Sequence, residues 1–238
     1  MIGQTDTLFT KPSIGANWSI GTDTSILHNI HNKETNIAIY NRDISDLQQE
    51  ILQVQEQNTE LKISGSLEQI VKELDRHLDP SINPLLSKDI RDLLKHYQEL
   101  TGSDQFRLLL ATINTNMCKK FHTDINTLRL LCTYNGPGTL WVADDNNTKD
   151  NGSSSGNLAI EEDRIHQVKT GSVALLKGAI YPDDDSTAIV HRSPTIEETG
   201  ERRLLLRIDT NELSNFLELT TTSLLNISLN KPYINDPK

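Results

Sequence analysis

The sequence predicts an α+β protein in which N-terminal helices pack on a barrel or sandwich of short strands. Residues 36–104 carry apolar residues mostly at helical spacing. Residues 105–210 instead contain eight short β-like segments separated by turn residues, a pattern typical of a barrel or sandwich. At 238 residues the chain is long enough to bury one substantial core.

Three helices are expected before the strands, at 43–57, 66–78 and 85–100. The first repeats apolar residues on one helical face, and Asp43 suits its N-cap. Ser66 is the expected cap of the second helix, and Gly102 ends the third. The apolar stripes of these helices must be covered, and the outer face of the larger sheet is the available surface.

Polar segments flank and interrupt these two regions. Residues 1–35, rich in Thr, Ser, Asn and Gly, predict a flexible N-terminal arm, and residues 211–238 predict a closing helix followed by a tail. Within the strand region, 144–157 is a Gly- and Ser-rich loop. We expect this loop to act as a lid over the candidate site.

Charge and cysteine usage restrict the class of function. The net charge of −10 gives no electrostatic footprint for nucleic acid or an anionic membrane surface, because both require clustered Lys and Arg. No apolar run approaches the ~20 residues that a membrane span requires, and the N-terminus lacks the apolar core of a signal peptide. Cys118 and Cys132 are too few for a disulfide scaffold. We therefore expect a cytoplasmic protein with reduced thiols.

The clearest chemical signal is the sequence FHTD, which places His122 and Asp124 two residues apart. In an extended strand such residues project from one face, so an imidazole and a carboxylate lie side by side. His191, in the β-like run AIVHRSP, is the candidate third ligand. Two histidines and one carboxylate with open positions opposite form the facial triad of non-haem Fe(II) oxygenases. The pattern predicts a mononuclear metal site at these three residues.

An ordered set of motifs surrounds these residues: FHTD, LRLLCTYNGPGTLWV, VKTGSVALLKG and IVHRSPTIEETGERRLLLRID. This order resembles the double-stranded β-helix, or jelly roll, of Fe(II)- and 2-oxoglutarate-dependent oxygenases, particularly the prolyl-hydroxylase-like branch. Pro137 departs from the Gly-Gly-x-Thr turn of that branch. The whole chain also resembles an uncharacterised bacterial domain-of-unknown-function family that carries CKKFHTD, GPGT and VHRSP. The resemblance implies a cupin-like jelly-roll barrel with the N-terminal helices packed on it.

The resemblance implies a role for each position that matches its motifs. His122, Asp124 and His191 hold Fe(II), which leaves positions for a bidentate 2-oxo acid and for O2. Arg202 binds the distal carboxylate of 2-oxoglutarate, since a guanidinium offers a carboxylate two parallel charge-assisted hydrogen bonds. Tyr134 donates to the same acid, or else is a core aromatic residue.

Strand alternation selects Arg202 over its neighbour. Arg202 shares one face of the strand RRLLLRID with three apolar residues, whereas Arg203 shares the other face with Arg207 and Asp209. A barrel interior is expected to be apolar except where a ligand supplies a counter-charge. We therefore expect Arg202 to point inward and Arg203 to lie in solvent or to pair with another residue outside the barrel.

The predicted function is hydroxylation of a small molecule or a protein side chain by an Fe(II)- and 2-oxoglutarate-dependent oxygenase. An alternative is a non-catalytic, cupin-like metal-binding or sensing protein, which requires the three ligands but not Arg202. Zinc is the alternative metal, because Cys118 is a soft ligand four residues before His122. A third alternative is a structural interaction domain that requires neither the ligands nor the arginine.

Overall fold

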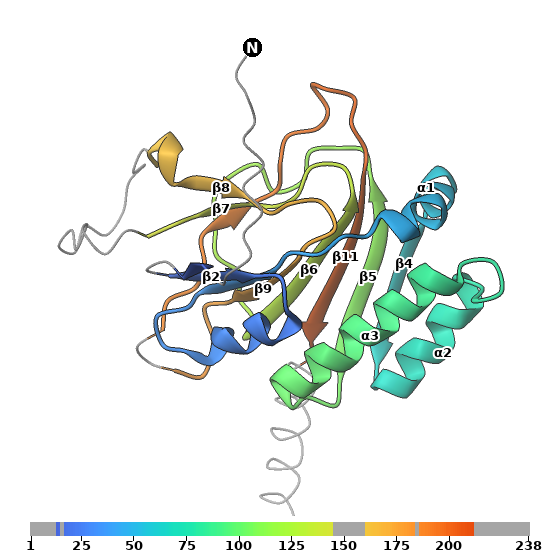
Figure 1. Cartoon of the computed structure of the whole chain (residues 1–238), viewed down its shortest axis with the longest axis horizontal. Coiled ribbons are helices and arrows are strands. Elements are labelled where there is room, and N and C mark those ends of the chain that lie inside the picture. Colours follow the sequence, from blue (N-terminus) through green and yellow to red (C-terminus); the bar gives the residue numbers. More distant parts are fainter. Residues whose placement is uncertain (1–12, 15–16, 145–159, 184–185, 212–238) are drawn as a thin grey trace, which may run out of the picture.

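The computed structural model describes residues 13–14, 17–144, 160–183 and 186–211. They form an eight-stranded sheet in the order β1-β2-β3-β9-β6-β11-β5-β4 and a small sheet in the order β10-β7-β8 (Figure 1). The strands are β1 (Ser13–Ile14), β2 (Trp18–Gly21), β3 (Ile37–Tyr40), β4 (Glu60–Gly65), β5 (Phe106–Ile113), β6 (Leu128–Asn135), β7 (Leu140–Val142), β8 (Ile165–Gln167), β9 (Val173–Lys177), β10 (His191–Arg192) and β11 (Arg203–Thr210). β11 lies inside the large sheet, antiparallel to both of its neighbours, β5 and β6.

The three predicted helices are present, but Asp43 is not the N-cap of the first: its carboxylate accepts from the Ser45 N–H before a short 3-10 helix, and the α-helix begins at Gln48 without a side-chain cap. The start of the second helix and the end of the third follow from local chemistry. The helices are α1 (Gln48–Glu56), α2 (Leu67–His77) and α3 (Pro84–Thr101), with the short 3-10 helices η1 (Thr24–His31), η2 (Ser45–Leu47) and η3 (Glu162–Arg164). The Ser66 hydroxyl accepts from the Gln69 backbone N–H, and the Ser66 N–H donates to the Gln69 side chain, which starts α2 with a capping box. Gly102 ends α3 at a φ of 64°, a left-handed conformation that favours glycine.

The helices cover one side of the large sheet, here called the helix face. Figure 1 shows α2 and α3 lying across β4, β5 and β11. On β11 this face is apolar from Leu204 to Ile208, because Leu204, Leu206 and Ile208 are buried in one cluster with α3 residues such as Tyr97. The Tyr97 hydroxyl also donates to the Leu128 carbonyl oxygen of β6 at 2.7 Å. Packing and this hydrogen bond fix α3 on the sheet.

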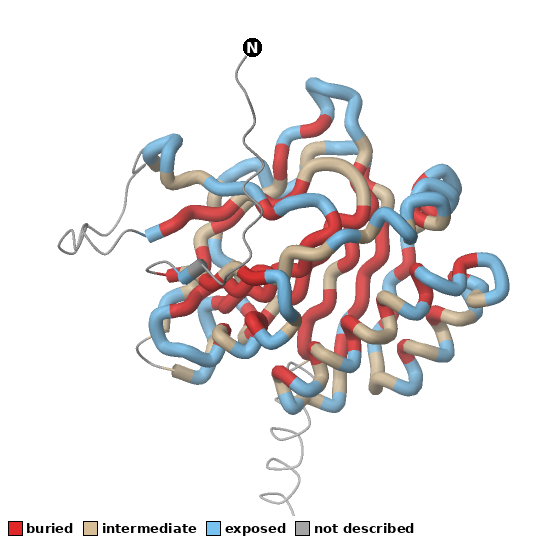
Figure 2. Tube along the Cα trace, viewed as in Figure 1, coloured by how far each residue is buried: buried red, intermediate tan, exposed pale blue. Residues whose placement is uncertain are grey.

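The other side of the large sheet, here called the inner face, packs against the small sheet. A second buried cluster joins Leu131 and Leu205 of the large sheet to Trp141 of β7. Figure 2 shows that the central strands are buried. The inner face also carries buried charges, since Arg203 and Asp209 of β11 project to the same side as Leu205. Polar groups therefore gather between the two sheets.

The structure matches the predicted architecture in part. A large sheet with helices on its outer side is present, but the two sheets do not close into a barrel within the described residues. The expected flexible arm is wrong for residues 18–31: Trp18–Gly21 pairs with β3, and η1 buries Ile26, Leu27 and Ile30 against the helix-face cluster. These three residues form a short apolar stripe that the surrounding polar residues obscure in the sequence.

Two expected segments lie outside the described residues. They are the lid at 144–157, of which Asp144 alone is described, and the closing helix beyond Asn211. In the part of the chain that is described, no helix combines the length and the apolar composition needed to cross a membrane.

Candidate metal centre

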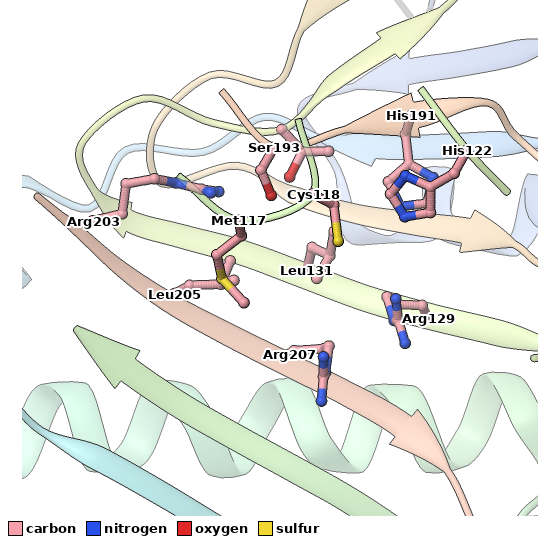
Figure 3. A pocket seen from close by; sticks show the side chains of 11 residues that line it. Met117, Cys118, His122, Arg129, Leu131, His191, Ser193, Arg203, Leu205 and Arg207 are labelled. Carbon is pink, nitrogen blue, oxygen red and sulfur yellow. The ribbon is translucent and has the colours of Figure 1, made fainter. Parts of the chain in front are cut away.

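Backbone pairing brings His122 beside His191. The His122 N–H donates to the His191 carbonyl oxygen at 3.0 Å, and the His191 N–H donates to the His122 carbonyl oxygen at 2.9 Å. Residues opposite each other in an antiparallel pair project to one side, so the two imidazoles leave the backbone together (Figure 3). β10 is paired in turn with β7, where the buried Trp141 lies opposite His191. The small sheet thus fixes both histidines.

Asp124 is positioned by a turn that packs against Gly178. The Ala179 N–H donates to the Asp124 carbonyl oxygen at 2.8 Å, and the Gly178 N–H donates to the Thr127 carbonyl oxygen at 2.9 Å. A Cβ atom at Gly178 would lie 2.0 Å from Asn126 Oδ1 and 2.1 Å from the Asn126 carbonyl oxygen. Only glycine allows the turn after Asp124 to approach β9 so closely.

His122, Asp124 and His191, here called the triad, direct their donor atoms toward one another. The three donor atoms all lie within 4.8 Å of each other. Asp124 Oδ1 is 3.6 Å from His122 Nε2, and Asp124 Oδ2 is 3.3 Å from His191 Nε2. The structure therefore brings the three expected ligands together in a two-nitrogen, one-oxygen set of the kind that first-row divalent metals bind.

The hydrogen bonds of the two imidazoles leave one particular nitrogen available. His122 Nδ1 lies 3.0 Å from the Lys120 carbonyl oxygen, and His191 Nδ1 lies 3.2 Å from the Ile189 carbonyl oxygen. A carbonyl oxygen only accepts, so in each neutral ring Nδ1 carries the proton and Nε2 keeps its lone pair. Such outer hydrogen bonds are typical of histidines that bind metals.

Asp124 is partly buried beside an arginine. The guanidinium of Arg129 on β6 hydrogen-bonds Asp124 Oδ2 and also donates from Nε to Asp209 Oδ1 at 2.6 Å. Burial alone would raise the pKa of Asp124, but the adjacent His191 and the charge of Arg129 outweigh burial and lower the pKa. The carboxylate is therefore ionised at neutral pH, as metal binding requires.

The triad opens into a hollow of about 70 Å³ between the two sheets. Its lining is Met117, Cys118, His122, Arg129, Leu131, Thr139, His191, Ser193, Arg203, Leu205 and Arg207. Figure 3 shows the two histidines at one end and Arg203 at the other, with Cys118 and Leu131 between them. The hollow joins the triad to three arginines.

Arg203 is the most deeply buried of these arginines, with 1% of its surface exposed. Its Nη2 donates to Thr133 Oγ1 at 3.1 Å, whereas its Nε has no partner among the described residues. Burial lowers the pKa of Arg203 to about 10. A buried guanidinium without a counter-ion is unfavourable. This end of the hollow therefore has the charge and the free donor needed to bind an anion.

The orientation predicted for Arg202 and Arg203 is wrong by one residue. Arg202 donates to the Gln55 carbonyl oxygen at 2.7 Å and to Asn58 Oδ1 at 2.6 Å, near the end of α1, and does not line the hollow. Arg203, expected in solvent, lines the hollow instead. The prediction took the fully apolar face of β11 for the interior between the sheets, but the helices cover that face.

Tyr134 also points away from the hollow. It is buried in the helix-face cluster, where its hydroxyl donates to Asp89 Oδ2 of α3 at 2.6 Å. The preceding residue, Thr133, projects to the inner face and contacts Arg203. Tyr134 is thus a core aromatic residue, the second of the two roles considered for it, and its hydroxyl is hydrogen-bonded to α3.

Sequence reasoning overlooked Arg129, and it grouped Arg207 and Asp209 with Arg203 on the face expected to point away from the site. Arg207 Nε lies 3.2 Å from Asp209 Oδ2, outside hydrogen-bond geometry, and Asp209 is 2% exposed. The available signal was the alternation R-x-L-x-R-x-D over 203–209, which places three charges on one face of a strand whose other face is apolar.

Solved structures with a similar fold include two oxygenases. The dioxygenase for auxin oxidation 1 from Arabidopsis thaliana, solved with 2-oxoglutarate, covers 82% of this chain and 91% of its own at 12% identity, with a TM-score of 0.50. A prolyl-4-hydroxylase from Pseudomonas putida covers 78% of this chain and 92% of its own at 12% identity, with a TM-score of 0.42. At such identity the likeness concerns the fold alone. No protein with a curated description matches the sequence.

A family match covers the region that carries the site. The family described as a protein of unknown function, DUF1826, matches residues 21–209. This range runs from the last residue of β2 to the penultimate residue of β11, so it includes the small sheet, the large sheet from β3 onward, the three main helices and all three triad residues. The chain therefore belongs to the DUF1826 family.

Proposed function

We propose that this chain is an Fe(II)- and 2-oxoglutarate-dependent oxygenase. The observation that carries the proposal is a hollow that runs from the two histidines of the triad to Arg203, a buried arginine that has no ion-pair partner among the described residues. The strand orders support a double-stranded β-helix, since β5, β11, β6 and β9 are neighbours in one sheet and the His122 bridge, β10, β7 and β8 follow one another in the other. The fold shared with a 2-oxoglutarate-bound dioxygenase agrees with this proposal.

The triad suits Fe(II). It offers two imidazole Nε2 atoms and one ionised carboxylate, while leaving positions for a bidentate 2-oxo acid and for O2. Bound iron would supply the redox chemistry that activates O2 as the 2-oxo acid is decarboxylated. The chain itself fixes the ligand geometry through the small sheet and through the turn held by Gly178.

Arg203 suits the distal carboxylate of 2-oxoglutarate, the role first expected of Arg202. The Nε–H of its guanidinium has no hydrogen-bond partner among the described residues. A carboxylate can accept two parallel hydrogen bonds from a guanidinium. A dicarboxylic acid that spans the hollow from the triad to Arg203 would neutralise the buried charge. Leu131 and Leu205 form apolar walls along the way and help to exclude water.

We propose a small molecule or a protein side chain as the substrate, rather than nucleic acid or membrane lipid. The net charge of −10 gives little attraction for polyphosphates or anionic lipid surfaces. A cytoplasmic location belongs to the same proposal, with Cys118 and Cys132 present as free thiols.

The test is an anaerobic titration of the chain with Fe(II) and then with 2-oxoglutarate. A 2-oxo acid chelated to iron gives a weak visible charge-transfer band. We expect the band with the natural sequence and its loss with Asp124→Ala, which removes one ligand. Absence of the band together with tight Zn(II) binding would reject the oxygenase in favour of a zinc protein.

One observation favours that second candidate, a non-catalytic metal-binding or sensing protein. Cys118 is an exposed free thiol that lines the hollow. A thiolate joining the triad would complete a closed tetrahedral site, as in structural zinc proteins. However, Cys118 does not belong to the group of donor atoms within 4.8 Å of one another. The open triad with Arg203 nearby fits the oxygenase better.

A further inference from the structure

We propose that Arg129, held in place by Asp209, is a positioning residue that orients the Asp124 carboxylate for metal binding. The inference rests on the metal site of the proposed function. It assigns a role to two residues that are not metal ligands and that act through Asp124.

One guanidinium links two carboxylates. Arg129 donates from Nε to Asp209 Oδ1 at 2.6 Å and from Nη2 to Asp209 Oδ2 at 3.3 Å, which is a two-pronged contact with one carboxylate. Its remaining terminal nitrogen, Nη1, hydrogen-bonds Asp124 Oδ2. The planar fork of arginine fixes the directions of all these donors at once, which lysine cannot do.

Asp209 is held rigidly and can therefore fix the position of the Arg129 guanidinium. Its side chain is 2% exposed and lies on β11, inside the large sheet, where strand pairing on both sides fixes its backbone. Asn126 Nδ2 lies 3.3 Å from Asp209 Oδ1 and belongs to the turn that follows Asp124. Asp209 therefore holds both the guanidinium that contacts Asp124 and the turn that carries Asp124.

The contact selects between the two oxygens of Asp124. Arg129 hydrogen-bonds Oδ2, which also lies 3.3 Å from His191 Nε2, whereas Oδ1 faces His122 Nε2 at 3.6 Å. An oxygen that accepts from a guanidinium has less electron density to give to a metal, so the arrangement favours binding through a single oxygen. A carboxylate that binds with both oxygens would occupy a position that an oxygenase needs for its 2-oxo acid or O2.

The charge of Arg129 does not oppose the metal strongly, because Asp209 offsets it. The guanidinium and its partner carboxylate form a pair with no net charge beside the triad. The pair instead orients the Asp124 carboxylate. Removing an outer partner of this kind typically weakens metal binding by about 10- to 100-fold.

The experiment compares Mn(II) affinity and the visible spectrum of bound Co(II) in the full-length chain and in Arg129→Lys. This variant keeps the positive charge and loses the fork. We expect Mn(II) to bind about 10-fold more weakly, and the Co(II) absorption bands, which report ligand number and geometry, to change. Arg107→Lys is the matched control: Arg107 lies opposite Asp209 on β5, is exposed, and forms no ion pair with a described residue.

Asp209→Asn provides a second variant, which removes the charge that holds Arg129 but keeps the shape. We expect the same two changes, smaller in size. If either folded variant binds Mn(II) as tightly as the natural chain and gives the same Co(II) spectrum, the positioning role is wrong. Failure of the metal site itself looks different: the natural chain and Asp124→Ala would then bind Mn(II) equally poorly.

Discussion

The two faces of β11 are covered in different ways, and they tolerate different residues. The helix face carries Leu204, Leu206 and Ile208, all buried under the helices. The inner face buries Arg203 and Asp209 just as deeply, at 1% and 2% exposure. Above these three β11 residues the helices pack apolar side chains such as Tyr97 and Leu93, so this part of the face is apolar. Buried charges persist on the inner face because each has a partner or a place for one: Asp209 binds Arg129, and Arg203 faces the hollow.

The largest effect is expected on the inner side, from Asp124→Ala. Loss of the carboxylate removes one of three ligands, so Mn(II) or Fe(II) binding should be abolished, as measured by calorimetric titration. Stability should change little, because Arg129 keeps its contact with Asp209. A strongly destabilised variant that still binds metal would show that Asp124 serves the fold and not the site.

The matching change on the helix face is Leu206→Ala. Leu206 is fully buried in the cluster beneath the helices, and truncation there leaves a cavity. We expect a loss of about 2–5 kcal/mol in the free energy of unfolding, measured with denaturant, and unchanged metal affinity in the folded fraction. A clear drop in metal affinity at constant stability would contradict the separation of the two faces.

A smaller and opposite effect on stability is expected from Arg203→Met. This change replaces a buried charge that forms no ion pair with a described residue by an apolar side chain of similar length, so the ligand-free protein should become more stable. A gain of about 1 kcal/mol corresponds to roughly 2–4 °C in thermal midpoint for a chain of this size. A lower midpoint without ligand would mean that Arg203 already has adequate partners in the fold.

The smallest expected effect is on acid stability. Because the folded state lowers the pKa of Asp124, its ionised form stabilises the fold at pH values above the ordinary carboxyl pKa of about 3.9. That contribution is lost as pH falls through the lowered pKa. Acid unfolding of metal-free Asp124→Asn should therefore be less steep below about pH 4 than that of the natural chain. Identical acid-unfolding curves for the two proteins below about pH 4 would argue against the ion pair between Asp124 and Arg129.

Local patterns in the sequence were sufficient for the helices and the triad. The capping box at Ser66 and the glycine stop at Gly102 act within a few residues, so they are readable without knowledge of the fold. His122 and Asp124 were recognisable by their spacing within one short segment, and His191 by its matching β-like context. The bridge that joins His122 to His191 spans the chain and only the structure shows it.

The residues that were misassigned depend on what covers each face of a strand. Strand alternation separated Arg202 from Arg203 correctly, but it does not say which face meets the helices. The same limit hid Arg129, because its partners Asp124 and Asp209 come from different strands and turns. The short apolar stripe of η1 was missed since three apolar residues among polar ones are too few to distinguish from a loop.

The central claim is that the charged inner face of β11 binds 2-oxoglutarate beside a metal held by the triad. The most direct measurement is the dissociation constant of 2-oxoglutarate for the anaerobic Fe(II)-loaded chain, followed through the visible band, in Arg203→Ala and Arg202→Ala. We predict that Arg203→Ala weakens binding by about 2–5 kcal/mol, as when one partner of a buried charge pair is removed, and that Arg202→Ala leaves binding unchanged. Weaker binding in Arg202→Ala with unchanged binding in Arg203→Ala would contradict the account.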